Sequence, residues 1–105
     1  MKVEKLNTMT RGWFMGNFEP SMYKGDFEVG AKDYKKGDIE LAHIHKLAKE
    51  FTVLLSGKAR MNNIYLEKGD IIQIDEFELT DFECIEDCIT LVVKTKSVQN
   101  DKYEL

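Results

Sequence analysis

Several residue types are scarce in this chain, and their scarcity argues against common protein classes. The 105 residues include one proline, two cysteines and two histidines. Two cysteines are too few for a small secreted scaffold held by disulfides, so we expect Cys84 and Cys88 to be reduced thiols. Positive charges are interspersed with negative ones and form no basic run, which argues against a nucleic-acid partner.

Long apolar runs are missing as well. The densest apolar stretches, residues 51–55 and 71–74, are far too short to span a bilayer, and the chain has no basic helix suited to a membrane surface. The first ten residues alternate polar and apolar side chains, without the hydrophobic region of a secretory signal. We therefore expect a cytoplasmic protein without a membrane contact.

The composition predicts one domain with a modest core. Of the 105 residues, 43% are hydrophobic and 32% are charged, and no linker or repeat divides them. We expect an aromatic-rich segment over residues 1–26, a barrel over 27–97 and a polar tail over 98–105. A chain this short buries a small fraction of its surface and therefore gains from oligomerisation.

Short strands separated by turn residues account for most of the chain. Strands are predicted over 27–34, 39–45, 51–55 and 71–74, and 59–66 is expected to be a hairpin that turns at Asn62-Asn63. Segments 80–85 and 89–94 are expected to pair across Glu86-Asp87. This pattern predicts an antiparallel β-sandwich or β-barrel.

Both histidines lie in one predicted strand, as His43-Ile44-His45. Alternate strand residues point to the same face, about 6–7 Å apart, so two imidazoles can converge on one ion at about 2.0–2.1 Å. Ile39 and Leu41 are expected on the same face. Glu50, at the start of the next apolar strand, would add a carboxylate and complete a two-His, one-carboxylate site with open positions. Two surface histidines remain the alternative.

The landmarks around the histidines match a known motif. Gly37, His43, His45, Glu50 and Gly57 follow the spacing G-x5-H-x-H-x4-E-x6-G. This spacing resembles the first motif of the cupin superfamily. The resemblance implies an antiparallel jelly-roll β-barrel, a homodimer, and a divalent Fe, Mn, Ni or Zn ion held by the two histidines and the glutamate.

The second cupin motif is degenerate. The segment 69–74, Gly-Asp-Ile-Ile-Gln-Ile, resembles its start, but Thr80 stands where the family has a further metal-binding histidine. Three alternatives stay open: the first-motif residues bind metal alone, Glu78 or Asp81 adds a carboxylate, or the pocket binds an organic ligand without metal.

Further candidates surround the expected pocket. Trp13 belongs to an aromatic group that would stack on a ligand or cover core, and Tyr65 and Glu78 are candidate acid–base groups. With Thr80 they form the expected substrate pocket. If Cys84 points inward, its thiol would lie near the site.

Two function classes follow from these observations. The first is a small metal-dependent enzyme, of the dioxygenase or isomerase and epimerase type, acting on a small oxygen-rich molecule. The second is a non-catalytic cupin that binds or senses a small molecule, with or without metal. A metal-free isomerase of nucleotide-linked sugars (RmlC-like) would need stacking aromatics, for which Trp13 is the only clear candidate.

Overall fold

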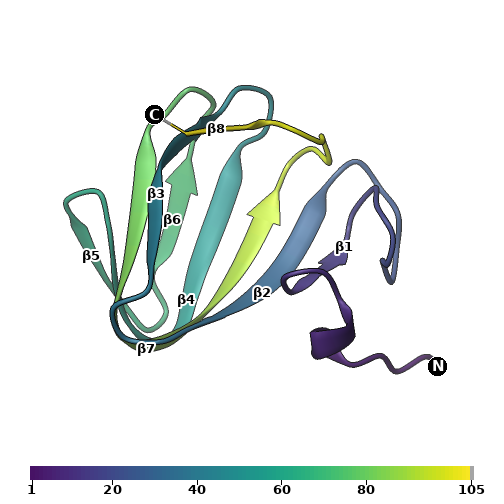
Figure 1. The fold of residues 1–105 in the computed structure, drawn as a ribbon, viewed down its shortest axis with the longest axis horizontal. Coiled ribbons are helices and arrows are strands. Elements are labelled where there is room, and N and C mark those ends of the chain that lie inside the picture. The colour runs from purple at the N-terminus through teal and green to yellow at the C-terminus, as the bar shows by residue number, and fades with distance from the viewer. Residues whose placement is uncertain (105) are drawn as a thin grey trace.

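A computed structural model describes residues 1–104, and its regular structure is almost entirely antiparallel sheet (Figure 1). One short 3-10 helix, η1 (Leu6–Thr8), precedes the strands. The strands are β1 (Trp13–Met15), β2 (Glu28–Tyr34), β3 (Ile39–His45), β4 (Glu50–Met61), β5 (Ile64–Glu67), β6 (Ile71–Ile74), β7 (Thr80–Lys94) and β8 (Lys102–Glu104). The fold is the predicted antiparallel β-barrel.

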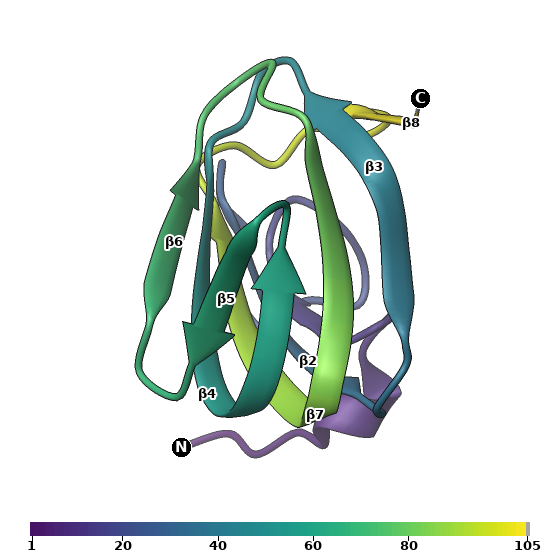
Figure 2. The same ribbon diagram turned by 90° about the vertical axis from the view of Figure 1, so that its left-hand side faces the viewer.

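The long strand β7 holds the barrel together. It pairs with β4 along most of its length, with β2 through residues 88–94, and with β3 through residues 80–83. Figure 2 shows the consequence, with β3 on one side of the molecule and β6 on the other. The sheet therefore curls around an interior instead of lying flat.

The predicted hairpin across Glu86-Asp87 is wrong, because residues 80–94 form one bent strand. Both halves find partners on other strands, so neither has to pair with the other. Gly57 of β4 permits the bend. Its φ is +81°, and a Cβ there would lie 2.2 Å from the carbonyl oxygen of Asp87. The backbones can approach because glycine has no side chain.

The predicted turn of the 59–66 hairpin is confirmed, whereas the break expected after residue 55 is wrong, because β4 runs unbroken from Glu50 to Met61. The β4–β5 hairpin turns at Asn62-Asn63, and Asn62 has a φ of 53°, in the left-handed region that asparagine tolerates. Residues 35–38 and 68–70 form turns, and β6 follows the second one. In the described part of the chain, no helix has the length and apolar character needed to cross a membrane.

One end of the barrel interior is apolar. Alternate residues of β4 and β7 point inward there and pack against β5 and β6. The buried core consists of Leu54, Ala59, Met61, Leu66, Ile74, Phe82, Cys84 and Cys88. This end is filled, so the open space of the barrel lies at the other end.

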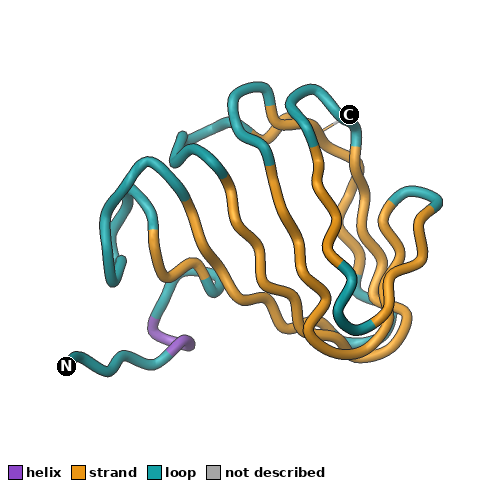
Figure 3. Tube along the Cα trace, turned by 180° about the vertical axis from the view of Figure 1, so that it is seen from behind, coloured by secondary structure: helices purple, strands orange, loops and turns teal. Residues whose placement is uncertain are grey.

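The end of the chain forms a strand, where the sequence predicted a polar tail. β8 pairs with β3, with Lys102 opposite His45 and Glu104 opposite His43. Asp101 fixes this segment, because its buried carboxylate accepts hydrogen bonds of 3.0–3.2 Å from the backbone amides of residues 46–48. Figure 3 shows the loops gathered at the end of the barrel that carries the C-terminus.

Candidate functional site

A cavity of about 580 Å³ opens at the polar end of the barrel. Its wall comes from β2, β3, β4 and β7, and its mouth from the N-terminal segment and residues 98–102. The lining is Thr10, Arg11, Trp13, Phe18, Glu19, Glu28, Lys32, Tyr34, Glu40, His43, His45, Glu50, Thr52, Met61, Phe82, Thr90, Val92, Lys94, Val98, Gln99, Asn100, Asp101 and Lys102. The cavity is large enough for a small organic molecule.

A bulge in β3 decides which of its residues face the cavity. Glu40 lies opposite Phe82 and His43 lies opposite Thr80, so the register shifts by one residue between them. The expected single face of Ile39, Leu41 and the histidines is therefore wrong. Ile39 and Leu41 are 63% and 59% exposed, whereas Glu40 lines the cavity together with the histidines. The extra residue exchanges inward and outward positions.

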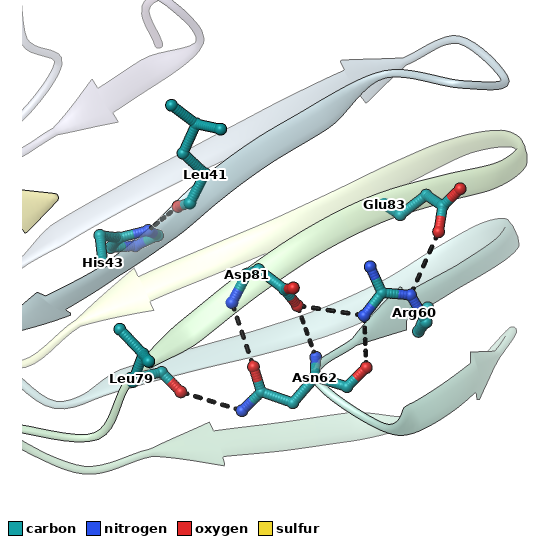
Figure 4. A network of polar contacts seen from close by, with 7 residues as sticks. All are labelled: Leu41, His43, Arg60, Asn62, Leu79, Asp81 and Glu83. Atoms are coloured by element: carbon teal, nitrogen blue, oxygen red, sulfur yellow. Dashed lines mark hydrogen bonds and ion pairs between the residues drawn. The ribbon is translucent and has the colours of Figure 1, made fainter. Parts of the chain in front are cut away.

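The bulge also orients His43. Its Nδ1 lies 2.9 Å from the carbonyl oxygen of Leu41 (Figure 4). A carbonyl only accepts, so Nδ1 carries the proton, and in the neutral ring Nε2 keeps a free lone pair. His43 is 7% exposed. Its ring is therefore held in the tautomer that a metal ligand requires.

His45 is buried without a partner for one ring nitrogen. Its Nε2 has no hydrogen-bond partner among residues 1–104. Burial lowers the pKa of His45 to about 4, with a smaller contribution from Lys94. The imidazole is therefore neutral at pH 7. The ring centroids of His43 and His45 lie 5.1 Å apart, with the ring planes nearly perpendicular.

Glu50 begins β4 and lines the same cavity. Burial raises its pKa, and Lys94, opposite it on β7, works in the other direction. The hydroxyl of Thr52 donates to Oε2 of Glu50 at 3.2 Å. Within residues 1–104, however, no three His, Cys, Asp or Glu side chains lie close enough to form a metal site as they stand.

Comparison with solved structures finds the same fold. A cupin-2 domain protein from Shewanella frigidimarina matches 66% of this chain and 70% of its own, at 16% identity and a TM-score of 0.60. Oxalate decarboxylase from Bacillus subtilis matches 76% of this chain at 18% identity and a TM-score of 0.68, and the match spans 24% of its length. The chain therefore has the cupin-type fold of these structures.

A third solved structure extends the comparison. An uncharacterised double-stranded β-helix protein from Klebsiella pneumoniae matches 69% of this chain at 22% identity and a TM-score of 0.63, and the match spans 65% of its length. No family model matches the sequence, and comparison with curated proteins finds no match. The structural similarity therefore gives the fold, and the function must be argued from the cavity.

Of the four residues expected to form the substrate pocket, Trp13 lines the cavity and three do not. Thr80 is buried opposite His43 but does not line the cavity. Tyr65 is 70% exposed on β5, because its neighbour Leu66 takes the inward position. Glu78 lies in the turn before β7, and its Oε1 accepts a hydrogen bond from the amide of Asp75.

Asp81 faces away from the cavity. Its carboxylate accepts from Arg60 at 3.2 Å and from the backbone amide of Asn62 at 2.8 Å (Figure 4). Arg60 also pairs with Glu83 at 3.1 Å. This group braces the β4–β5 hairpin against β7, so neither Asp81 nor Arg60 belongs to the site.

Sequence reasoning missed Glu40 and Tyr34. The Tyr34 hydroxyl donates to Oε1 of Glu40 at 3.2 Å inside the cavity. Burial raises the pKa of Tyr34, and the Glu40 carboxylate raises it further, so the hydroxyl stays protonated. The alternation of β3 assigned Glu40 to the outer face, and only knowledge of the bulge would have placed it inside.

The basic residues of the cavity were also missed. Lys32 of β2 and Lys94 of β7 both line it, from two strands that pair with each other. In the alternation of β2, Lys32 shares a face with Glu28, Gly30 and Tyr34. That pattern was available in the sequence, but charged residues on a strand usually face solvent.

The two cysteines belong to the core. Both are about 1% exposed and neither forms a disulfide. Burial raises the pKa of the Cys88 thiol to about 12. Neither thiol lines the cavity. They pack as small apolar side chains, as expected of reduced thiols without a redox role.

Proposed function

We propose that this cupin binds a divalent metal ion through His43, His45 and Glu50 and acts on a small oxygen-rich molecule in the same cavity. The observation that carries the proposal is the buried Nε2 of His45, which has no hydrogen-bond partner among the described residues. A buried polar atom without a partner costs free energy, and a metal ion would use its lone pair.

The donor set fits a metal in its chemistry. His43 donates its Nδ1–H to Leu41 and so leaves Nε2 available to an ion, His45 has a neutral ring, and Glu50 begins the next strand with a buried carboxyl group. These donors suit Fe, Mn, Ni or Zn. Since the three side chains do not yet form a cluster, binding requires at least one of them to change rotamer. A bound cation would also favour the ionised form of Glu50.

The ion would supply Lewis-acid chemistry, or dioxygen activation if it is iron. The chain itself supplies the proton-transfer groups. Glu40 can exchange a proton with a ligand, while the Tyr34 hydroxyl hydrogen-bonds its carboxylate and holds it in place. Trp13 and residues 98–102 complete the cavity lining around these groups.

One structural neighbour supports a metal in this fold. Oxalate decarboxylase from Bacillus subtilis contains Mn(II) centres, and this chain matches its fold over 76% of the present residues. At 18% identity that match supports the proposal without carrying it. The donors in the cavity remain the main argument.

The test is metal content by mass spectrometry of protein purified without a histidine tag. We expect near-stoichiometric metal in the wild type and a loss of at least tenfold in His43→Ala/His45→Ala and in Glu50→Gln (about 1.4 kcal/mol or more). Glu78→Gln is the matched control and should retain metal. Absence of metal after incubation with Fe, Mn, Ni and Zn would show the proposal to be wrong.

A non-catalytic ligand-binding cupin is the second candidate. Thr80, in the place of the second-motif histidine, and the lack of a formed three-residue cluster within residues 1–104 favour it. In that case the cavity would bind its ligand in the variants that have lost metal, without turnover. The expected homodimer and cytoplasmic location stay predictions.

A further inference from the structure

The indole of Trp13 lies on the inner face of β2 because Gly30 has no side chain. Trp13 pairs with Gly30 across β1 and β2, and a Cβ at Gly30 would lie 2.7 Å from the indole ring. The ring therefore lies flat against the strand within the cavity lining. Any larger residue at position 30 would displace it.

Two lysines flank this indole. The ammonium of Lys32 lies 4.3 Å from the ring centroid and that of Lys94 lies 4.9 Å from it. Lys94 has a carboxylate nearby, 3.9 Å away on Glu28. Among the ion pairs of residues 1–104, none involves Lys32. Its ammonium donates instead to the carbonyl oxygen of Arg11 and retains further protons for donation.

A buried hydroxyl without a partner lies next to Lys32. Thr90 is opposite Lys32 in the pairing of β2 with β7, lines the cavity and is 2% exposed. Its Oγ1 has no hydrogen-bond partner among residues 1–104. Lys32 and Thr90 thus occupy opposite positions on paired strands, and within residues 1–104 the hydroxyl has no acceptor and the ammonium has no ion-pair partner. One oxyanion could satisfy both groups.

We propose that Lys32 and Thr90, on the Trp13 platform and beside Lys94, bind the carboxylate or phosphate group of the small molecule in the cavity. The proposal deepens the proposed function, because it rests on the same cavity and names the substrate class as anionic. An anion held there would place the remainder of the molecule toward His43 and His45, which line the same space.

The alternative is that the lysines only balance acidic neighbours. Glu28 already accepts from Ser97 and lies near Lys94, and Glu40 accepts from Tyr34. Among residues 1–104 these contacts leave Lys32 without an ion-pair partner, and they do not reach the hydroxyl of Thr90. Burial lowers the pKa of Lys32 to about 8, and the charge of Glu40 opposes this shift only in part. A bound anion would raise it again.

Trp13 is the single tryptophan of the chain, so its fluorescence reports directly on this subsite. We would titrate the protein as purified with malonate and with inorganic phosphate, using sodium chloride to match ionic strength. We expect a saturable change with one of the two anions, which identifies the carboxylate or the phosphate class. Lys32→Met and Thr90→Val should each weaken this binding, the former by about tenfold or more.

Two control variants separate the effect of the Lys32 charge from a general loss of positive charge. Lys68→Met removes a charge from an exposed turn and should bind like the wild type, whereas Lys32→Arg keeps the charge and should retain most of the affinity. Circular dichroism checks that each variant is folded. Failure of both anions to give a saturable change, or equal affinity in Lys32→Met and the wild type, would overturn the subsite.

The metal-free variant His43→Ala/His45→Ala separates the two proposals. Retained anion binding there, with loss on Lys32→Met, supports the subsite even if no metal is found in the wild type. Metal binding in a wild type whose anion affinity does not depend on Lys32 would support the proposed metal site and refute the anion subsite.

Discussion

The two ends of the barrel interior are built by the same strands but have opposite chemistry. Along β4 the inward residues run from Glu50 and Thr52 to Leu54 and then into the core. Along β7 they run from Lys94 to the buried Cys88. The apolar end excludes water and supplies most of the favourable burial. The polar end holds charges and hydroxyls whose free energy would be lower in solvent.

Because of this difference, binding free energy is available at the polar end of the interior. The buried groups His45 Nε2 and Thr90 Oγ1, which have no partner among residues 1–104, both lie at the polar end. In the apolar end, Leu54 is 0% exposed and Cys84 is 1% exposed, so substitutions there act on stability. Substitutions at the polar end should act mainly on ligands, and variants from each end can test this division.

The largest expected effect is at the apolar end. Leu54→Ala removes a fully buried side chain at the centre of the core and should lower the free energy of unfolding by about 2–5 kcal/mol. Urea denaturation measures the change. Below its unfolding transition the variant should still bind metal, because Leu54 does not line the cavity. Loss of metal from a folded Leu54→Ala protein would contradict the division between the two ends.

The next effect concerns residues 98–102, the segment at the mouth of the cavity. Asp101→Ala removes the acceptor for three backbone amides and should cost about 2–3 kcal/mol, since charge-assisted hydrogen bonds are stronger than neutral ones. Hydrogen exchange at residues 46–48 should accelerate. Asp101→Asn keeps one oxygen acceptor, so its stability and its exchange rates should lie between those of Asp101→Ala and the wild type. Unchanged exchange in Asp101→Ala would show that the segment is held by β8 alone.

The sequence predicted the apolar end better than the polar end, for a physical reason. Alternation of apolar residues is enough to place Leu54, Phe82 and Cys84 inside, and turn chemistry located the hairpin at Asn62-Asn63. The motif spacing singled out His43, His45 and Glu50, and all three line one cavity. The metal itself stays a prediction.

The missed residues depend on features that a single sequence does not reveal. The bulge in β3 turns Glu40 inward, and no turn residue or glycine signals it. The polar residues 86–87 favour a turn in the sequence, but in the structure they lie within β7, which stays one bent strand because it pairs with three other strands. Both are tertiary effects that override a local pattern. Lys32 differs, because the alternation of β2 already places it on the inner face, and what the sequence does not show is the Trp13 ring that packs over Gly30 beside it.

A smaller effect is expected from the charge of Lys32. Burial, together with Arg11, Lys94 and Lys102, lowers the pKa of Lys32 to about 8, and Glu40 acts in the opposite direction. Below pH 8 the native state therefore holds an ammonium that the unfolded chain accommodates more easily. Lys32→Met should then be more stable than the wild type at pH 7, by about 1–2 kcal/mol after allowance for partial solvation.

The sign of its pH dependence follows from proton binding. Between pH 8 and the ordinary lysine value of 10.5, the unfolded wild type binds more protons than the native state, so its stability rises with pH. The advantage of Lys32→Met should therefore shrink over this window. Urea denaturation at pH 7 and pH 10 measures it, with Lys68→Met as the control. A constant difference between variant and wild type would show that Lys32 titrates normally.

The smallest expected effect gives the clearest comparison. Substituting valine for each of two buried threonines of the cavity should change the stability in opposite directions. Thr90 and Thr52 are 2% and 3% exposed and lie on paired strands. The Thr52 hydroxyl donates to Glu50, whereas that of Thr90 has no partner among residues 1–104. Thr90→Val should therefore stabilise the protein by about 1 kcal/mol, and Thr52→Val should destabilise it by about the same amount.

Binding should reverse the ranking of these two variants. Thr90→Val removes a donor from the anion subsite and should weaken the binding of malonate or phosphate, although the protein becomes more stable. Thr52→Val leaves that subsite intact and acts on Glu50 instead, so its effect should appear in metal content. Thermal unfolding, anion titration and metal analysis of the two variants measure all three quantities. If Thr90→Val were destabilised as much as Thr52→Val, the Thr90 hydroxyl would already have a partner in the free wild-type protein, and it would not be a vacant donor for an anion.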